Sequence, residues 1–397
     1  MPIKGAIQRS FPSNYRPMSS LTFYGRLQQL DFEGYRFLLD LEGRVKWIIP
    51  LRAHLWPGPS AALRRTLGNR WLLYDSGGYQ GVLELSGRYY FPAPFGLPAH
   101  PFVQAEASRL EEPLAILNMA ARRWGIPGPV ELSRQAARLR SILKANVPVL
   151  PPDTIQVDYD VIPLMAVRGC LHNCSFCWVK TSADPEAVSA SEFNQQMQAV
   201  KEWIGADIEN YSSLFLGQND GLAAGASCAA EAVRRASEEF HADRVFLFAS
   251  VASLLRCCQD QPGGIEGLAH ALCPGPGPEI HLNIGIESFC QDVLDTLGKP
   301  VDARDCKRAF SCGLELCRQR SQLHVSFNFI LARRFGTEHM DALRTALAGI
   351  EPAAGSTVYL SPLLEEKWRP GELRRAIFSV KAASRLPVFC YFIVPWL

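Results

Sequence analysis

The feature that most constrains the fold is a regular alternation of short apolar segments and longer amphipathic ones that begins after residue 152. Such alternation predicts a parallel sheet whose strands are joined by crossover helices. The clearest helix is expected over Ala190–Ile204, where Ser189 and Glu192 form a capping box before apolar residues at helical spacing. The expected strands are Pro163–Val167, Ser213–Leu216, Arg244–Ala249, Ile280–Ile286, His324–Leu331 and Thr357–Ser361.

Six strand–helix units correspond to three-quarters of an eight-fold barrel. A further apolar run, Val388–Val394, is a candidate extra strand. Active sites of such barrels gather at the carboxyl ends of the strands. Here those ends are polar or rich in glycine, as in the stretch 217–221 after the second strand and at Glu287-Ser288 after the fourth. We therefore expect an α/β fold, a partial (β/α)6 TIM-type barrel, with its site at this edge.

The chain before the barrel has a different pattern. Residues 1–30 contain three prolines and little periodicity, so no regular structure is expected there. Tyr35–Asp40 and Val45–Ile49 flank a turn at Glu42-Gly43-Arg44, which predicts a β-hairpin. A second hairpin is expected over Gly81–Phe91, around Ser86-Gly87-Arg88. These segments predict a small sheet at the start of the chain.

Helical patterns follow from about Pro101 to Asn146, and the proline-rich segment Pro148–Pro152 then forms a linker. A row of arginines in these helices is interpreted as a solvated helix face, although it could also face an acidic partner. The expected organisation is therefore an irregular segment 1–30, a small α+β accessory domain 31–150 of unknown role, and the barrel 151–397.

A short motif lies between the two expected hairpins. Asp75-Ser76-Gly77-Gly78-Tyr79-Gln80 resembles the signature of the tRNA-guanine transglycosylases, in which the aspartate is catalytic. The strands around it do not form a recognisable barrel. We interpret the hexapeptide as a Gly-Gly turn with a capping aspartate.

Charge and hydropathy set limits on partners and location. The 41 basic residues nearly balance the 39 acidic ones, and no block of five or more Lys/Arg occurs, so charge gives no reason to expect a polyanion. The apolar run Val388–Val394 is far shorter than the roughly 18 residues that a membrane span requires. Residues 1–30 lack the apolar core of a signal peptide, and twelve cysteines suit a reducing compartment. A cytoplasmic protein without a membrane span is expected.

Three of the cysteines, Cys170, Cys174 and Cys177, lie close together in a polar loop directly after the first expected strand. Their spacing lets three thiolates converge on one inorganic centre while one coordination position stays open. A [4Fe-4S] cluster accounts best for this arrangement. A zinc ion that also uses His172 and a chance cluster of packed thiols are the alternatives. The cysteines within helical and apolar segments elsewhere are expected to be structural.

The motif Cys170-x3-Cys174-x2-Cys177, with Phe176 before the third cysteine, resembles the signature of the radical S-adenosylmethionine (radical SAM) enzymes. Residues 217–220 stand where that family usually carries Gly-Gly-Glu, and residues 284–288 stand where its fourth strand presents polar groups to the ribose. Three later runs resemble the branch that includes methylthiotransferases and coproporphyrinogen oxidase-like enzymes. They are Val293–Lys299, Phe327–Leu331 and Gly336–Glu338.

The resemblance implies a [4Fe-4S] cluster and S-adenosylmethionine as cofactors. It implies reductive cleavage of S-adenosylmethionine to a 5′-deoxyadenosyl radical, which abstracts hydrogen from an unidentified small-molecule, peptide or nucleotide substrate. An external one-electron donor such as flavodoxin or ferredoxin is then required. Metal binding is assigned to the three cysteines; cofactor binding is assigned to Phe176, Gly217, Gln218, Asn219, Asp220, Gly285, Glu287 and Ser288.

The sequence departs from the family pattern in two places. The second-strand motif lacks the second glycine and the glutamate, and Ala332 stands where the branch often has glycine. Neither a second three-cysteine motif nor the Asp-x-His-x-x-Gly signature of cobalamin binding is found in the sequence. The alternative function is a non-catalytic iron-sulfur or zinc protein that binds a partner through residues 31–150. Candidate pocket-lining residues on the strands are His281, Asn283, Asn328, Tyr359 and Ser361, for which barrel-interior packing is the alternative.

Overall fold

The computed structural model describes residues 15–18, 27–50, 63–67, 70–74, 83–84, 115–145, 161–170, 172, 174–177, 184–217, 219–363, 366 and 369–390. Its main element is a seven-stranded sheet in which every neighbouring pair is parallel and the strands lie in chain order. The strands are β8 (Val161–Leu164), β11 (Ser213–Leu216), β12 (Arg244–Ser250), β13 (Glu279–Glu287), β14 (Leu323–Leu331), β15 (Ser356–Pro362) and β16 (Val388–Cys390).

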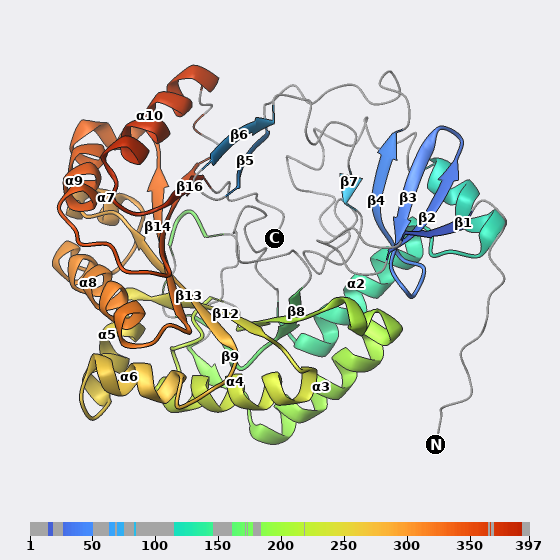
Figure 1. Cartoon of the computed structure of the whole chain (residues 1–397), viewed down its shortest axis with the longest axis horizontal. Coiled ribbons are helices and arrows are strands. Elements are labelled where there is room, and N and C mark those ends of the chain that lie inside the picture. The colour runs from blue at the N-terminus through green and yellow to red at the C-terminus, as the bar shows by residue number, and fades with distance from the viewer. Residues whose placement is uncertain are drawn as a thin grey trace.

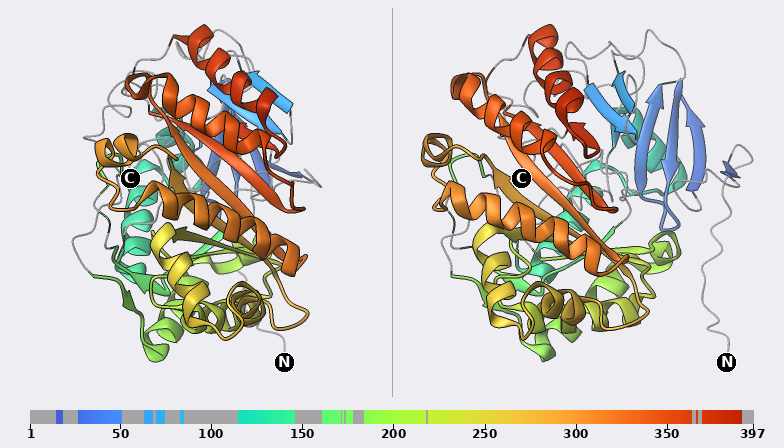
Figure 2. Two further views of the ribbon diagram at one scale, coloured as in Figure 1. Left: turned by 90° about the vertical axis from the view of Figure 1, so that its left-hand side faces the viewer. Right: turned by 60° about the vertical axis from the view of Figure 1, so that its left-hand side comes forward.

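The crossover helices lie on the outer side of this sheet (Figures 1 and 2). Strands in sequential order with helices on one side are the topology of a (β/α) barrel, so the expected partial barrel is confirmed. Its last strand, β16, falls within the candidate extra strand. The helices are α3 (Ala190–Ile204), α4 (Ala226–Phe240), α5 (Val251–Asp260), α6 (Ile265–Leu272), α7 (Gln291–Thr296), α8 (Ala303–Gln319), α9 (Gly336–Ala348) and α10 (Pro370–Ala383).

Most strand boundaries differ from the expected ones by one residue, but the first strand is different. The expected segment Pro163–Val167 divides into β8 and the two-residue strand β9 (Val167–Arg168), which pairs antiparallel with β10 (Glu186–Ala187). Between them, the Met165 N–H donates to the Gln196 side chain at 2.6 Å. Because a helix side chain takes this hydrogen bond, the chain leaves the sheet before it enters the cysteine loop.

The two faces of the sheet differ in polarity. In β13, Ile280, Leu282, Ile284 and Ile286 belong to the large hydrophobic core of the barrel. Alternate residues of a strand point to opposite faces, so His281, Asn283, Gly285 and Glu287 lie on the other, inner face. On the helix side, a Cβ added to Gly313 of α8 would lie 2.6 Å from Phe327 of β14. The outer layer is therefore close-packed, and the polar residues are collected inside.

A smaller antiparallel sheet precedes the barrel. Its order is β1 (Tyr15–Met18), β2 (Leu27–Phe32), β3 (Tyr35–Leu39), β4 (Val45–Pro50) and β7 (Leu83–Glu84). Pairing of β3 with β4 confirms the first expected hairpin. One face of this sheet packs on the helical residues 115–124 through a core of Leu30, Tyr35, Phe37, Leu39, Leu117, Ala120 and Ile126.

The other expectations for the start of the chain are less fully covered. Of the second expected hairpin, Leu83 and Glu84 form β7, which pairs with β4, and the rest lies outside the described residues, as does Asp75–Gln80. A separate hairpin, β5 (Leu63–Leu67) and β6 (Arg70–Tyr74), lies beside β16 (Figure 1). The divisions at residues 30 and 150 stay predictions. The expectation of no regular structure in residues 1–30 is wrong for residues 15–18 and 27–30, because β1 and the start of β2 pair there as an antiparallel ladder. Helix α2 (Pro129–Leu143) gives Leu139 and Leu143 to the barrel core.

Arg44 joins the small sheet to the barrel. It lies in the turn between β3 and β4, and its guanidinium bonds Asp40 at 2.5 Å. It also donates to the carbonyls of Trp203 and Ile204, at the end of α3, at 3.1 and 2.9 Å. From the same turn, Glu42 accepts the Ala206 N–H at 2.6 Å. A buried arginine with this many partners fixes the sheet against the barrel.

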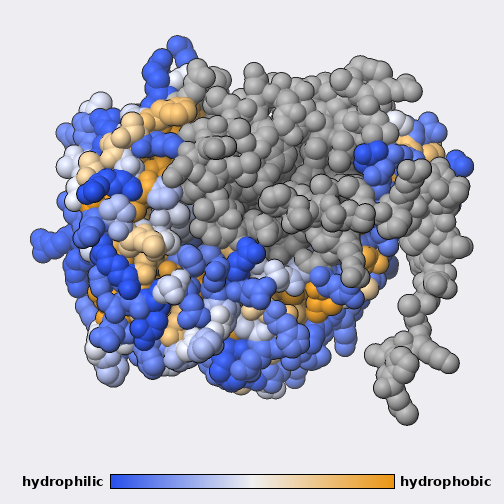
Figure 3. Space-filling view, in the orientation of Figure 1, coloured by the Kyte–Doolittle hydropathy of each residue, from blue (hydrophilic) through white to orange (hydrophobic). Residues whose placement is uncertain are grey.

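The part of the outer surface that Figure 3 shows in colour is mainly polar. Figure 3 shows hydrophilic side chains along the rim where Figure 1 places α3 and α4. In the part of the chain that the structure describes, no helix is both long enough and apolar enough to cross a bilayer.

Candidate cofactor site

The three cysteines of the motif lie in the loop that leaves β9. Cys174 is buried, Cys170 and Cys177 are half-buried, and none of the three is in a disulfide. The loop is compact, because the Cys177 N–H donates to the Cys174 carbonyl at 3.1 Å. The His172 N–H lies 3.4 Å from the sulfur of Cys170, which is the kind of N–H···S contact that tunes iron-sulfur clusters.

The loop is tied to the segment that follows β13. Both the N–H and the hydroxyl of Ser175 donate to the Leu297 carbonyl, at 2.8 and 3.0 Å. The neighbouring Phe176 packs against an apolar cluster formed by Val293, Leu297, Ile330, Ala332, Phe335 and Leu363. Phe176 therefore anchors the cysteine loop between the ends of β13 and β14.

The electrostatics of the thiols show which charged groups lie around them. Burial raises the pKa of Cys174 to about 11; Lys299 opposes the rise, and Glu287 adds to it. Burial also raises the pKa of Cys170, where the His172 N–H opposes the rise and Asp220 adds to it. Without a metal, both thiols are therefore protonated at neutral pH, and loading a metal would release protons.

Asp220 is held rigidly at the end of β11. Its Oδ1 accepts a hydrogen bond from the Ser253 hydroxyl at 2.7 Å, and Ser253 lies in the first turn of α5. The turn itself begins at Gly217, whose φ of +104° favours glycine and whose N–H donates to Leu164 at 2.8 Å. Asn219 is half-buried, and Gln218 lies outside the described residues.

Glu287 ends β13 in an unusual backbone conformation. Its φ is +67°, and the pairing with β14 shifts register between Gly285 and Glu287. Its carboxylate lies 3.0 Å from the Lys299 ammonium. Burial raises the pKa of Glu287, and Lys299 opposes that rise. A Cβ on Gly285 would lie 2.5 Å from the Glu287 carboxylate, so a glycine is needed beside this ion pair.

Lys299 has no role in the prediction from sequence, although it ends one of the runs that resemble the family branch. Its charge acts on Cys170, Cys174 and Glu287 at once. The available signal was a lysine placed just after the helix that follows the fourth strand. The motif alone did not show that its side chain turns back to the cysteines.

Ser288 is fully buried, and its hydroxyl is used within the protein. It lies 2.9 Å from His339 Nδ1 and accepts the Cys290 N–H at 2.9 Å. The Nε2 atom of His339, on α9, lies 2.8 Å from the Ile330 carbonyl oxygen. Ser288 thus connects the end of β13 to α9, whereas Glu287 beside it turns to Lys299.

The structure gathers the three cysteines, Asp220, Glu287 and Lys299 at the carboxyl edge of the sheet. Deeper inside, Asn283 and Asn328 bond one another and Asn283 donates to Ser326 at 2.6 Å. The other pocket-lining candidates, Tyr359 and Ser361, are buried on β15, and His281 lies near the opposite end of β13. The polar inner face is therefore continuous with the cysteine loop edge.

The sequence matches no protein-family model and no curated protein. Its structure is similar to radical SAM enzymes at low sequence identity. The first is a radical SAM methyltransferase from Sphaerobacter thermophilus, with 15% identity over 57% of this chain and 64% of that one, at a TM-score of 0.39. The chain therefore spans less than two thirds of that relative.

Two further solved structures are similar to the chain. The cobalamin-dependent S-adenosylmethionine radical enzyme OxsB has 13% identity over 50% of this chain and 29% of its own, at a TM-score of 0.34. Methylornithine synthase (PylB) has 15% identity over 69% of this chain and 74% of its own, at a TM-score of 0.35. Scores this low carry no argument about activity, which must come from the site itself.

Proposed function

We propose that this chain is a radical SAM enzyme that holds a [4Fe-4S] cluster on Cys170, Cys174 and Cys177. The carrying observation is the position of the Cys-x3-Cys-x2-Cys loop, whose three thiols lie at the carboxyl edge of a sequentially ordered parallel sheet. When bound, a cluster with one open iron supplies the electron that cleaves S-adenosylmethionine to a 5′-deoxyadenosyl radical. The spacing of the three cysteines and the place of their loop at the functional edge of the sheet support an iron-sulfur cluster rather than a zinc ion or packed thiols.

The residues around the loop fit such a group. Cys174 is buried, and the Lys299 ammonium favours its thiolate form. Gly217, Asn219 and Asp220 after β11, with Gly285 and Glu287 at the end of β13, are proposed to bind S-adenosylmethionine, as are Gln218 and Ser288. Since the strained backbone of Glu287 costs free energy, this conformation at a strand end supports a functional role.

The substrate is proposed to be a small molecule, a peptide or a nucleotide that reaches the polar inner face near Asn283 and Asn328. An external one-electron donor such as flavodoxin or ferredoxin would reduce the cluster. The runs that include Lys299 and Ile330 support the proposal that the chain belongs to the branch of methylthiotransferases and coproporphyrinogen oxidase-like enzymes. An oxygen-sensitive cluster also suits a cytoplasmic location.

The test is anaerobic reconstitution of the full chain with iron and sulfide, followed by dithionite and S-adenosylmethionine. The expected result is visible cluster absorption and formation of 5′-deoxyadenosine, measured by mass spectrometry. A cluster that forms but yields no 5′-deoxyadenosine, even with cell extract as a substrate source, would support the non-catalytic alternative. Binding of one zinc ion with no iron would support the zinc alternative instead.

A further inference from the structure

A second group of metal-ligating side chains lies at the amino end of the sheet, far from the cysteine loop. Glu279 is the first residue of β13, His281 follows two positions later, and His324 is the second residue of β14. His281 and His324 are direct neighbours in the register of the two strands. Glu287 lies six positions after His281 in the same strand, which is about 20 Å of strand.

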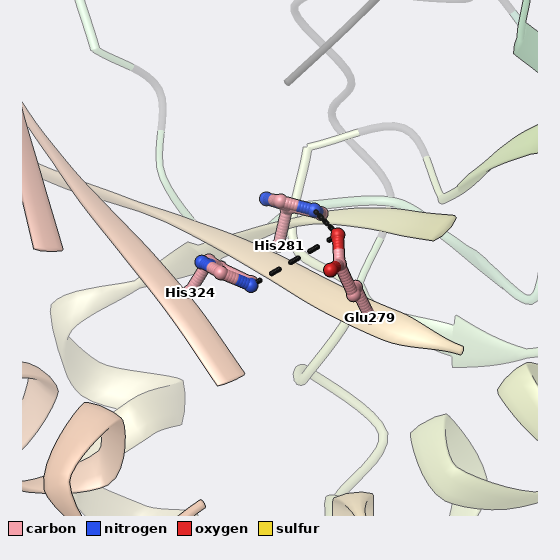
Figure 4. Close-up of side chains that lie close together, drawn as sticks. All are labelled: Glu279, His281 and His324. Atoms are coloured by element: carbon pink, nitrogen blue, oxygen red, sulfur yellow. Dashed lines mark ion pairs between the residues drawn. The ribbon is translucent and has the colours of Figure 1, made fainter. Parts of the chain in front are cut away.

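The three side chains converge on one point (Figure 4). One carboxylate oxygen of Glu279 lies 3.6 Å from His281 Nε2 and 4.0 Å from His324 Nε2. The three ligand atoms all lie within 4.8 Å of one another. These separations are too long for hydrogen bonds, which join heavy atoms at about 2.7–3.2 Å.

Both Nε2 atoms are buried, and neither has a hydrogen-bond partner in the part of the chain that the structure describes. His281 is more than nine-tenths buried, so water around the protein cannot readily satisfy its nitrogen. A buried ring nitrogen without a partner is unfavourable. Two such nitrogens directed at one carboxylate indicate that a bound species completes the group.

The two imidazoles are held in place by stacking. The ring of His281 lies between Phe246, at a centroid distance of 4.6 Å, and His324, at 4.5 Å. Gly355 leaves room for His324, since a Cβ there would lie 2.9 Å from its Nδ1. The stacking therefore holds both rings in place before any ligand arrives.

We propose that Glu279, His281 and His324 bind one divalent transition-metal ion of the zinc type, with water as the remaining ligand. Two imidazoles and a carboxylate are a usual ligand set for zinc. Bonds of 2.0–2.1 Å around a tetrahedral ion place ligand atoms about 3.3 Å apart, and the Glu279 oxygen lies 3.6 and 4.0 Å from the two Nε2 atoms. The Glu279 side chain is half exposed, so it can move closer to both rings.

The charge state of the rings agrees with this site. Burial lowers the pKa of His281 to about 3, with His324 and Arg244 adding to the effect. Burial also lowers the pKa of His324, against the opposing charge of Glu279. Both rings are thus neutral at pH 7, the form that binds metal. The positive charge of Arg244 disfavours a bound cation, and the negative charge of the Glu279 carboxylate offsets that effect.

The proposal does not depend on the proposed radical chemistry, because it concerns the other end of the sheet. Its role would be to join β13 to β14. To separate the two metal sites, the full chain is prepared with Cys170, Cys174 and Cys177 all replaced by serine. Co²⁺ and Zn²⁺ are the probes, with metal content measured after dialysis.

The expected result is one equivalent of Zn²⁺ bound by the triple-serine chain, and a Co²⁺ spectrum without sulfur-to-cobalt charge-transfer absorption. Adding Glu279→Gln should weaken binding at least tenfold, and adding His324→Asn should abolish it. The matched control is His241→Asn, at an exposed helix end whose φ of +51° suits asparagine. It should leave binding unchanged.

Absence of a bound equivalent in the triple-serine chain would overturn the proposal. Binding that is unchanged by Glu279→Gln would overturn it as well. Among the residues that the structure describes, the half-exposed Glu279 side chain makes no hydrogen bond, so this variant decides the question even if His324→Asn unfolds the chain. Far-ultraviolet circular dichroism of each variant checks that the fold is retained.

Discussion

The Lys299 ammonium lies 3.0 Å from the Glu287 carboxylate, and both side chains are more than nine-tenths buried. The pair connects the end of β13 with the loop after α7, and it lies beside the cysteine loop. Because both partners also influence the pKa of Cys174, the pair bears on both the stability of the fold and the site.

Replacement of Lys299 by methionine should destabilise the chain by about 3–5 kcal/mol, because it leaves a buried carboxylate without a counter-charge. Glu287→Gln combined with Lys299→Met should recover a large part of that loss. Chemical denaturation of the two single variants and the double variant measures the coupling. Arg234→Met is the control: Arg234 pairs with Glu231 and Glu238 on the exposed face of α4, so the change should be within about 1 kcal/mol. Equal losses in the single and double variants would contradict the prediction.

Acid should destabilise the fold through its buried histidines. Burial lowers the pKa of His339, which the Ile330 carbonyl partly opposes, so the unfolded chain takes up a proton near pH 6.5 before the folded chain does. Stability is therefore complete above about pH 6.5 and falls as the pH drops below it. Denaturation curves between pH 7.5 and 5 should show this loss, with a smaller slope in His339→Gln.

Other histidines with lowered pKa values, namely His172, His281 and His324, add to the acid loss in the unmodified chain. The comparison for His339→Gln is therefore His270→Gln, on the exposed end of α6. If His339→Gln and His270→Gln gave the same slope of stability against pH, His339 would not contribute to the acid destabilisation.

Arg44→Met should loosen the small sheet from the barrel. It removes hydrogen bonds to the Trp203 and Ile204 carbonyls and leaves Asp40 buried beside them. Loss of a buried ion-pair partner costs about 3–5 kcal/mol. Arg36→Met is the matched control, since Arg36 pairs with Asp31 at 2.9 Å on a half-exposed surface, where about 1 kcal/mol or less is expected. Thermal unfolding measures both, and a similar effect in the two variants would refute the role of Arg44.

Cys174→Ala should prevent stable binding of the cluster, because two thiolates cannot replace three. After anaerobic reconstitution, iron content and visible absorption should both fall to a small fraction of the unmodified level. Cys228→Ala is the control, because Cys228 is a half-buried thiol on α4 whose pKa is raised by burial alone. If Cys174→Ala kept all of its iron and visible absorption, Cys174 would not be a ligand of the cluster.

The sequence by itself determined the order of strands and helices and the position of the cysteine loop. Those features depend on residues close together in the chain: the apolar period of α3, its Ser189 cap, and three thiols within eight residues. Local spacing fixes local structure, and chain-order strands with crossover helices leave few topologies.

Tertiary structure alone decided the partners of the buried charged groups. Arg44 meets Ile204 across 160 positions, and Lys299 meets Glu287 only because α7 turns the chain back. His281 was a pocket-lining candidate, but its neighbours follow from the register of β13 and β14, which sets His324 beside it. Register and packing depend on the whole core, so no local pattern of residues could have placed these side chains together.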